Sequence, residues 1–223
     1  VPLWRLLVDL SPSQVVDLLD LSYLEDVMTR EDALDLLTVH AASKHERQSI
    51  LAAGYPGYDT SIGWFNYSDE QVRSNIQGAV DAGFTAMKLK VGSAETERDI
   101  RRAYMVREVA GDSAQVMLYV NQSWTLPKAI RACLALSDMN PFWIEEPTHP
   151  DDVLAHQTLA RAISPMKVAL GEHVPHRVLF KNFMQAGAVD FVQVDAVRVG
   201  GVSEFITISL LARKFGLPVV PHV

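Results

Sequence analysis

The chain contains little cysteine and no long apolar run, and both absences narrow its class. Its 223 residues include a single cysteine, Cys133, which cannot form an internal disulfide. We therefore expect a reducing compartment, the cytoplasm or, for a eukaryotic relative, the mitochondrion. No apolar run reaches the roughly 18 residues that suggest a membrane span, and no secretory signal opens the sequence, so membrane insertion is not expected.

Positive charge is also scarce. The chain has 20 Lys and Arg residues against 27 Asp and Glu residues, a formal net charge of -7, and no dense basic run. Because nucleic-acid surfaces need clustered positive charge, this balance argues against a nucleic-acid partner. An anionic small molecule would need a local positive site.

The remaining composition is that of an ordinary globular domain, 48% hydrophobic and 21% charged. From about residue 68 onward, short β-like runs alternate with amphipathic runs, which predicts a parallel sheet with helical crossovers. Helices are expected between Ser68 and Gly83, over 96–110, from Pro127, and near 151–163, 176–186 and 203–215. Strands are expected at 86–91, 116–120, 142–145, 168–170, 191–194 and 218–220, with a Gly-interrupted first strand at 60–64.

This order predicts an α/β fold, a truncated (β/α) barrel with about seven of eight strands. The chain is shorter than the about 250 residues of a typical complete barrel. We assign residues 51–223 to the partial barrel. Residues 1–50 show helical pieces around 4–7 and 31–37 and no clear strand, and we interpret them as the C-terminal remnant of another domain plus a connector.

A polar residue follows the apolar run of almost every predicted strand. In chain order these residues are Lys88, Lys90, Tyr119, Asn121, Glu145, Glu172, Asp195 and His222. Singly, each is more often a solvated strand end, an ion-paired group or a structural histidine than a functional residue. In a parallel barrel, however, all these strand ends lie on one face, where active sites of this architecture form. Their recurrence favours a single site.

The residue types at these strand ends suggest a particular chemistry. Carboxylates on neighbouring strands suit a hard divalent cation such as Mg²⁺. A lysine beside a cation and another lysine is pushed toward its neutral form, which can act as a general base. Asp195 can orient His222 and raise its basicity. Together these groups indicate proton abstraction from a carbon acid and stabilisation of an enediolate.

Several motifs closely resemble the enolase superfamily, in particular its mandelate racemase-like group. They are Lys88-Leu89-Lys90, Asn121-Gln122, Trp143-Ile144-Glu145-Glu146-Pro147, Gly171-Glu172, Asp195 with Arg198-Val199-Gly200-Gly201, and Pro221-His222. The resemblance implies a Mg²⁺-dependent acid-sugar dehydratase of the L-fuconate or L-galactonate type. Such an enzyme removes the α proton and then water, and the product is a 2-keto-3-deoxy acid sugar.

The resemblance also implies roles for individual residues. Lys90 would take the α proton, while Lys88 would help neutralise the substrate carboxylate and Asn121 would bind substrate. His222, oriented by Asp195, would be the acid that assists departure of the β-hydroxyl. The implied ligands of Mg²⁺ are Glu145 and Glu172. The implied partner is a small sugar acid, and relatives of this architecture commonly assemble, which allows a homo-oligomer.

Three departures from the family pattern keep alternatives open. Tyr119 stands where the family places its first metal-binding aspartate, and a neutral phenol is a poor Mg²⁺ ligand, so we expect weaker metal binding. The eighth strand is expected beyond Val223, and most of the capping domain is absent. The alternatives are a racemase or epimerase of the same superfamily, in which Lys90 and His222 exchange one proton, and a catalytically silent relative.

Overall fold

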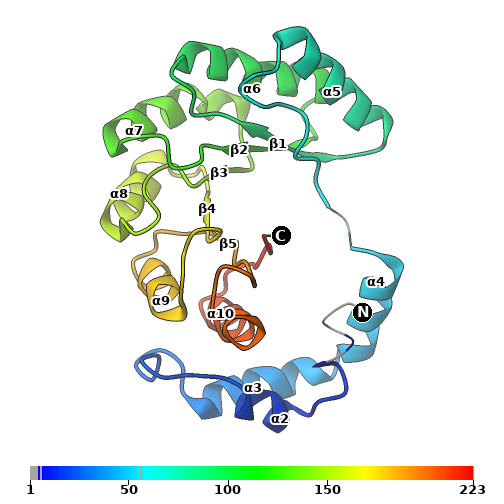
Figure 1. Ribbon diagram of the computed structural model, residues 1–223, viewed down its shortest axis with the longest axis vertical. Helices are drawn as coiled ribbons and strands as arrows, with labels where there is room; N and C mark the ends of the chain where they lie inside the picture. The colour runs from blue at the N-terminus through cyan, green and yellow to red at the C-terminus, as the bar shows by residue number, and fades with distance from the viewer. Residues whose placement is uncertain (1–4, 6, 56, 223) are drawn as a thin grey trace.

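The computed structural model describes residues 5, 7–55 and 57–222, and its strands form one parallel sheet with helices along its outer side (Figure 1). The helices are α2 (Pro12–Asp17), α3 (Arg30–Ala41), α4 (Lys44–Ala53), α5 (Asp69–Asp81), α6 (Thr96–Ala110), α7 (Leu126–Ala135), α8 (Val153–Ile163), α9 (Arg177–Gln185) and α10 (Val202–Lys214), with a 3₁₀ turn at Ser137–Met139. The strands are β1 (Ala86–Lys90), β2 (Gln115–Tyr119), β3 (Trp143–Glu145), β4 (Val168–Leu170) and β5 (Phe191–Val192). No helix in these ranges is long and apolar enough to cross a membrane.

The helices predicted from residue 68 onward are confirmed to within a few residues, because their ends carry local signals. The Ser68 side chain accepts a hydrogen bond from the Gln71 amide and so caps α5. Pro127 lies in the first turn of α7, where its missing N–H costs nothing. Helix α4 was not predicted, and it buries no residue, which explains its weak amphipathic signal. The predicted helical piece around 4–7 falls largely outside the described residues.

The five strands lie in the order β1-β2-β3-β4-β5, and every pairing is parallel. In the register of the sheet, Lys90 pairs with Tyr119 and Tyr119 pairs with Glu145. Lys88 lies one pleat earlier, opposite Met117. Because residues paired across parallel strands point to the same face, Lys88, Lys90, Tyr119 and Glu145 share the inner face of the curved sheet.

The two outermost predicted strands exist only as isolated bridges. Asp59, just before the predicted strand at 60–64, forms the parallel bridge with Met87 of β1. The Asp59 carboxylate accepts hydrogen bonds from the Ser61 amide (2.6 Å) and hydroxyl (2.7 Å), which bends the chain away from an extended ladder. The segment at 218–220 flanks β5 through the bridge of Val192 with Val219, and Pro218 has no N–H to donate to the ladder there.

Two clusters of buried apolar side chains lie on the two faces of the sheet, one between the strands and the helices and one on the inner face. The larger cluster packs the outward side chains of the strands, such as Leu89, Leu118 and Ile144, against the helices. The smaller cluster fills the inner face with Met117, Trp143 and Ala169. Since a buried apolar floor lies beneath the strand ends on the inner face, polar side chains placed above it are partly shielded from water.

The N-terminal helices are joined to the rest of the chain by a shared core and by ion pairs. Leu24 and Met28 are fully buried in the larger cluster. Lys214 of α10 lies 2.6 Å from the Asp32 carboxylate, and Arg213 of α10 donates to His40 at 3.0 Å. Helix α3 thus lies against α10, as Figure 1 shows, and α2 packs on α3.

Candidate active site

Lys88 and Glu145 form a buried ion pair on the inner face. The Lys88 ammonium lies 2.7 Å from Oε1 of Glu145, and the two side chains are 8% and 0% exposed. The other carboxylate oxygen, Oε2, accepts a hydrogen bond of 3.0 Å from the Trp143 indole. Both oxygens of Glu145 therefore have partners, and the charge of Lys88 is balanced within the protein.

Lys90 has a different environment, although it lies only one pleat further along β1. Its ammonium sits 4.4 Å from the centre of the Trp64 ring and 4.6 Å from the centre of the Tyr119 ring. It makes no ion pair within 4.0 Å among the described residues. Burial lowers the pKa of Lys90, and the neighbouring Lys88 charge lowers it further, while Glu172 opposes the shift. Lys90 therefore loses its proton more readily than an exposed lysine does.

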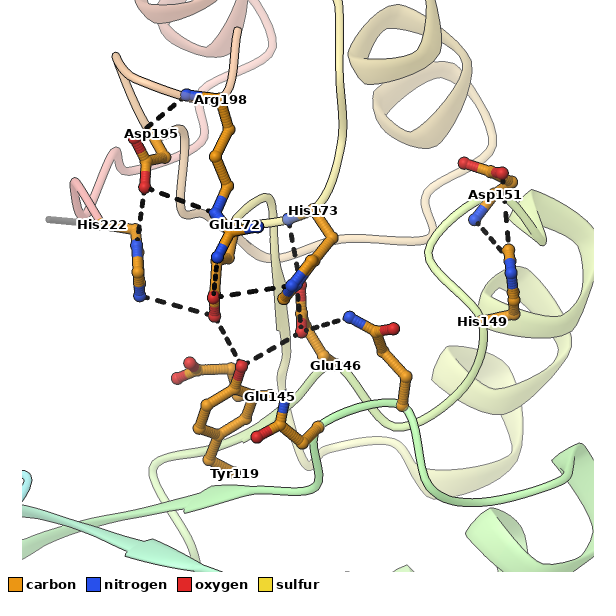
Figure 2. Close-up of polar contacts among 12 residues, drawn as sticks. Tyr119, Glu145, Glu146, His149, Asp151, Glu172, His173, Asp195, Arg198 and His222 are labelled. Atoms are coloured by element: carbon orange, nitrogen blue, oxygen red, sulfur yellow. Dashed lines mark hydrogen bonds and ion pairs between the residues drawn. The ribbon is translucent and has the colours of Figure 1, made fainter.

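Tyr119 stands between the two lysines and a group of carboxylates. The Lys88 ammonium lies 4.8 Å from the centre of its ring. Its hydroxyl donates a hydrogen bond of 2.5 Å to Oε2 of Glu172 and approaches Oε2 of Glu146 at 3.3 Å. Burial and these carboxylates raise the pKa of the Tyr119 phenol, which stays neutral and acts as a donor. Figure 2 shows the hydroxyl directed at Glu172 and Glu146.

Glu146 enters the site because the chain turns sharply after β3. Its φ of 44° lies in the left-handed region, which a non-glycine residue seldom adopts. The buried carboxylate accepts from the Gln122 side chain at 3.0 Å and lies 2.8 Å from Nδ1 of His173. Glu146, Glu172 and His173 bring three potential ligand atoms within 4.8 Å of one another.

Glu172 connects the two sides of the site. Arg198 donates to its Oε1 at 3.0 Å, while Nε2 of His222 lies 3.4 Å from its Oε2. Gly171 lets the backbone reach the position of Glu172. A Cβ at residue 171 would lie 2.6 Å from the Gln193 carbonyl carbon, and its φ of +145° is a value that side chains disfavour. Only glycine lets the chain pass so close to Gln193 before Glu172.

Asp195 and His222 form the pair that the sequence predicted to meet. Nδ1 of His222 lies 2.8 Å from Oδ2 of Asp195. Burial alone would raise the pKa of Asp195, but hydrogen bonds from His222 and from the Val197 and Arg198 amides hold it below its usual value. The carboxylate is ionised and orients the imidazole, whose Nε2 faces Glu172.

A cavity of about 590 Å³ opens onto these groups. Its lining includes Lys88, Lys90, Tyr119 and His222, with Trp64 on the β1 side. Its volume is in the usual range for a small-molecule site. A larger groove of about 1110 Å³ runs between the N-terminal helices and α10, and its lining includes none of the predicted site residues.

The structure brings most of the predicted site residues together but adds partners that the sequence reading missed. Lys88, Lys90, Tyr119, Glu145, Glu172, Asp195 and His222 form one connected region. Asn121 is half-buried with φ of 57°, and its side chain makes no hydrogen bond within the described residues. Glu146, His173, Arg198 and Trp64 were not predicted as site residues. Glu146 and Arg198 lie within motifs that carry the family resemblance, and His173 is adjacent to Glu172, so these positions offered a sequence signal.

The residues around Glu172 fit a divalent cation. Glu146 and Glu172 supply carboxylate oxygens and His173 supplies a nitrogen, all within 4.8 Å. Tyr119 is a neutral donor and cannot replace a carboxylate ligand. Glu145 is not part of this group, and its oxygens bind Lys88 and Trp143.

A parallel α/β domain with ionisable side chains gathered at the carboxyl ends of its strands is typical of α/β-barrel enzyme domains. Within that class, the sequence profile described as "Enolase C-terminal domain-like" matches residues 71–223. The chain belongs to the enolase superfamily.

Individual relatives support this assignment. The chain is 42% identical to human mitochondrial enolase superfamily member 1 over 99% of its length and 50% of the relative's. The crystal structure of that human protein superposes with a TM-score of 0.95 at 41% identity, over 100% of this chain and 51% of that one. L-Galactonate dehydratase from Hypocrea jecorina is 37% identical over 99% of this chain and 50% of its own length. The chain thus spans about half the length of these relatives.

A third relative carries a metal ion and a sugar acid. The crystal structure of L-talarate dehydratase from Polaromonas sp. JS666, complexed with Mg and L-glucarate, has a TM-score of 0.73 at 29% identity. The match covers 95% of this chain and 63% of that one. Magnesium is therefore the cofactor found in a solved relative.

Proposed function

We propose that this domain carries the proton-transfer site of a Mg²⁺-dependent acid-sugar dehydratase of the L-fuconate or L-galactonate type. The observation that carries the proposal is that Lys90 and His222 line one cavity. Lys90 has a lowered pKa and no ion-pair partner within the described residues, and His222 is held by Asp195. The dehydratases among the relatives add independent support.

In the proposed reaction, neutral Lys90 removes the proton from the carbon next to the substrate carboxylate. The electron pair of that C–H bond moves toward the carboxylate and gives an enediolate. The β C–O bond then breaks, and the hydroxyl leaves as water with a proton from His222. The enol product tautomerises to a 2-keto-3-deoxy acid. The released electron pair forms the new carbon–carbon double bond, so no oxidant or reductant is needed.

The other residues of the cavity orient the substrate. Lys88 supplies positive charge near the substrate carboxylate, although its ion pair with Glu145 already balances much of that charge. The aromatic rings of Trp64 and Tyr119 hold the Lys90 ammonium at 4.4 and 4.6 Å and shield it from water. Glu172 would be a ligand of Mg²⁺, which when bound supplies positive charge beside the substrate carboxylate.

The direct test is turnover of L-fuconate and L-galactonate with MgCl₂, with the keto product detected as its semicarbazone. Tyr119→Asp, which restores the family's carboxylate, is expected to raise turnover. Lys90→Met is the matched inactive control. The dehydratase proposal fails if Tyr119→Asp, in a chain completed to the length of its relatives, gives no keto product from either sugar acid.

A racemase or epimerase is the second candidate, because Lys90 and His222 border the same cavity and could exchange a proton at one carbon. In D₂O, that activity would place deuterium at the α carbon without loss of water. A catalytically silent relative is the third candidate, favoured by the hydrogen bond between Tyr119 and Glu172. It would bind a sugar acid equally well with and without Mg²⁺ in calorimetry.

The compartment and assembly complete the proposal. Burial raises the pKa of the Cys133 thiol to about 12, so this cysteine is an unreactive core residue. A reducing compartment, cytoplasmic or mitochondrial, suits a protein with one such thiol. Sedimentation of the purified protein would show whether it forms a homo-oligomer.

A further inference from the structure

The loop of residues 63–67 lies directly beside Lys90. The Lys90 amide donates to the Gly63 carbonyl at 3.2 Å, so the loop follows the edge of β1 at this residue. A Cβ at residue 63 would lie 2.5 Å from Cδ1 of the buried Leu89, and the absence of a side chain lets the loop approach the strand. The next residue, Trp64, then places its ring centre 4.4 Å from the Lys90 ammonium.

Two arginines of α6 bind this loop through its backbone carbonyls. Arg98 donates to the carbonyls of Phe65 and Tyr67 at 3.0 and 2.9 Å. Arg102 donates to the Trp64 carbonyl at 3.1 Å and also to the Tyr67 carbonyl. Because a guanidinium presents its N–H donors in a rigid plane, each arginine fixes the relative position of two carbonyls. The backbone of the loop is therefore set by α6.

Arg102 is the buried member of this pair. It is 2% exposed, and a buried guanidinium destabilises a protein unless its charge is paired and its N–H groups have acceptors. The Asp69 carboxylate at the start of α5 lies 2.7 Å from its Nε and balances the charge. The carbonyls of Trp64 and Tyr67 accept from its two terminal nitrogens. The loop that carries Trp64 is thus part of a buried ion-pair network between α5 and α6.

The ammonium group of Lys90 depends on aromatic rings for its position. No carboxylate oxygen of the described residues lies within 4.0 Å of it. The ring centres of Trp64 and Tyr119 lie 4.4 and 4.6 Å away, which is the range of cation–π contacts. Lys88, in contrast, is fixed by its ion pair with Glu145. Since a lysine ends in a flexible four-carbon stem, loss of the Trp64 ring would free the Lys90 ammonium to leave the cavity.

We propose that Arg98 and Arg102 are positioning residues for the base of this site, because they fix Trp64 and its ring fixes the ammonium end of Lys90. The consequence for catalysis rests on the proposed function, in which Lys90 removes the α proton, whereas the contacts themselves do not. A reacting amine must lie about 3–3.5 Å from the α carbon, and a freely rotating side chain seldom occupies that position. Helix α6 thus controls the reaction from outside the cavity.

Nuclear magnetic resonance of the reductively ¹³C-methylated protein at pH 7 tests the contact without any substrate. A dimethylated lysine keeps its charge and its affinity for aromatic rings, so the Lys90 methyl signal should lie upfield of the exposed lysines. The signal that is missing in Lys90→Gln identifies it. Trp64→Leu should move this signal toward the exposed lysines, and Trp64→Phe should keep part of the upfield shift.

Arg98→Gln tests the contribution of α6. The Arg98 side chain is 25% exposed, so its replacement disturbs the core less than that of Arg102. The variant frees two carbonyls of the loop, and the Lys90 signal should move in the same direction as in Trp64→Leu. Near-ultraviolet circular dichroism verifies the fold of each variant. If Arg98→Gln does not fold, Arg98→Lys takes its place, because it keeps the charge and loses the planar pair of donors.

Arg101→Gln is the matched control for these variants. Arg101 is exposed on the same helix, and it donates no hydrogen bond to residues 63–67, all of which the structure describes. The Lys90 signal should therefore stay where it is in the unmodified protein. A general loss of positive charge on α6 would instead move the signal equally in Arg98→Gln and Arg101→Gln, which contradicts the proposal.

Turnover of L-fuconate or L-galactonate with MgCl₂ tests the consequence for catalysis. In the protein in which keto product forms, Arg98→Gln should lower kcat about tenfold, because a misplaced base reacts slowly. KM should change little, since Arg98 is not among the residues that line the cavity. Arg101→Gln should keep the kcat of its parent. Equal kcat values in Arg98→Gln and Arg101→Gln would show that the contact does not serve catalysis.

The positioning of Lys90 and the dehydratase activity can fail separately. A Lys90 signal that coincides with those of exposed lysines, or that does not move in Trp64→Leu or Arg98→Gln, overturns the positioning whatever the turnover. If the signal behaves as expected and neither sugar acid gives keto product, the positioning of Lys90 stands and the dehydratase proposal is wrong.

Discussion

The hydroxyl of Tyr119 donates a hydrogen bond of 2.5 Å to Oε2 of Glu172, the carboxylate that also faces His222. This contact joins the lysine side of the site to the Asp195–His222 side. A shorter side chain at position 119 would leave Glu172 without this donor. Tyr119, which stands where the family pattern has an aspartate, is therefore part of the hydrogen-bond network of the site.

Tyr119→Phe should lower the free energy of unfolding by about 1–3 kcal/mol, because two buried carboxylates lose a shared donor. Urea unfolding at pH 7 measures the change. Tyr104→Phe is the control, since Tyr104 is 38% exposed, and it should change stability little. Equal losses in the two variants would contradict a specific role for the Tyr119 hydroxyl.

Glu145→Gln should be more costly, about 3–5 kcal/mol, because it leaves the Lys88 ammonium buried and unpaired. The double variant Lys88→Met/Glu145→Gln should recover much of that loss, as a urea double-mutant cycle would show. The exposed pair of Lys167 with Asp190 provides the contrast, with a coupling energy of about 0–1 kcal/mol. Similar coupling energies for both pairs would show that the Lys88–Glu145 pair is solvated.

Lys90 should titrate below the ordinary lysine pKa of 10.5, because burial and Lys88 disfavour its charged form. After reductive ¹³C-methylation, nuclear magnetic resonance follows each lysine against pH, and the signal missing in Lys90→Gln identifies Lys90. Activity that depends on neutral Lys90 should rise with pH through the same value. A Lys90 titration at or above 10.5 would remove the reason for choosing it as the base.

Asp195→Asn should reduce stability by about 2 kcal/mol near pH 7, because the charge-assisted bond to His222 and the bonds from two amides weaken. The folded protein holds the pKa of Asp195 below the ordinary value of 3.8. Its contribution is therefore fully present well above pH 3.8 and is lost as the pH falls through the lower folded value.

Urea unfolding of wild type and Asp195→Asn between pH 7 and pH 3 measures this dependence. The stability difference should be constant at neutral pH and should shrink in acid. The exposed Asp112→Asn serves as the control and should show little difference at any pH. A difference that grows as the pH falls would reverse the assigned direction of the pKa shift.

The order of the elements could be predicted from the sequence because the signals that set it are local. Ser68 caps a helix, Pro127 opens another, and apolar runs bury the strands between them. The polar residues at strand ends could be recognised for a similar reason. A charged residue directly after an apolar run is visible in the sequence without knowledge of the fold. Both predicted edge strands are reduced to isolated parallel bridges, since apolar composition does not reveal the Asp59 turn or the missing N–H of Pro218.

The sequence by itself determined the parallel α/β architecture, the polar residues at the strand ends and the departure from the family pattern at Tyr119. Only the tertiary structure decided which partners the carboxylates of Glu145 and Glu146 contact. Glu145 follows the alternation of β3 into the interior and meets Lys88, whose position is far away in the chain. The left-handed backbone of Glu146 turns the next carboxylate toward His173 and Glu172. The side chains of these two adjacent glutamates thus point to different partners. A backbone turn and a contact between distant parts of the chain set their directions, and residue type alone reveals neither.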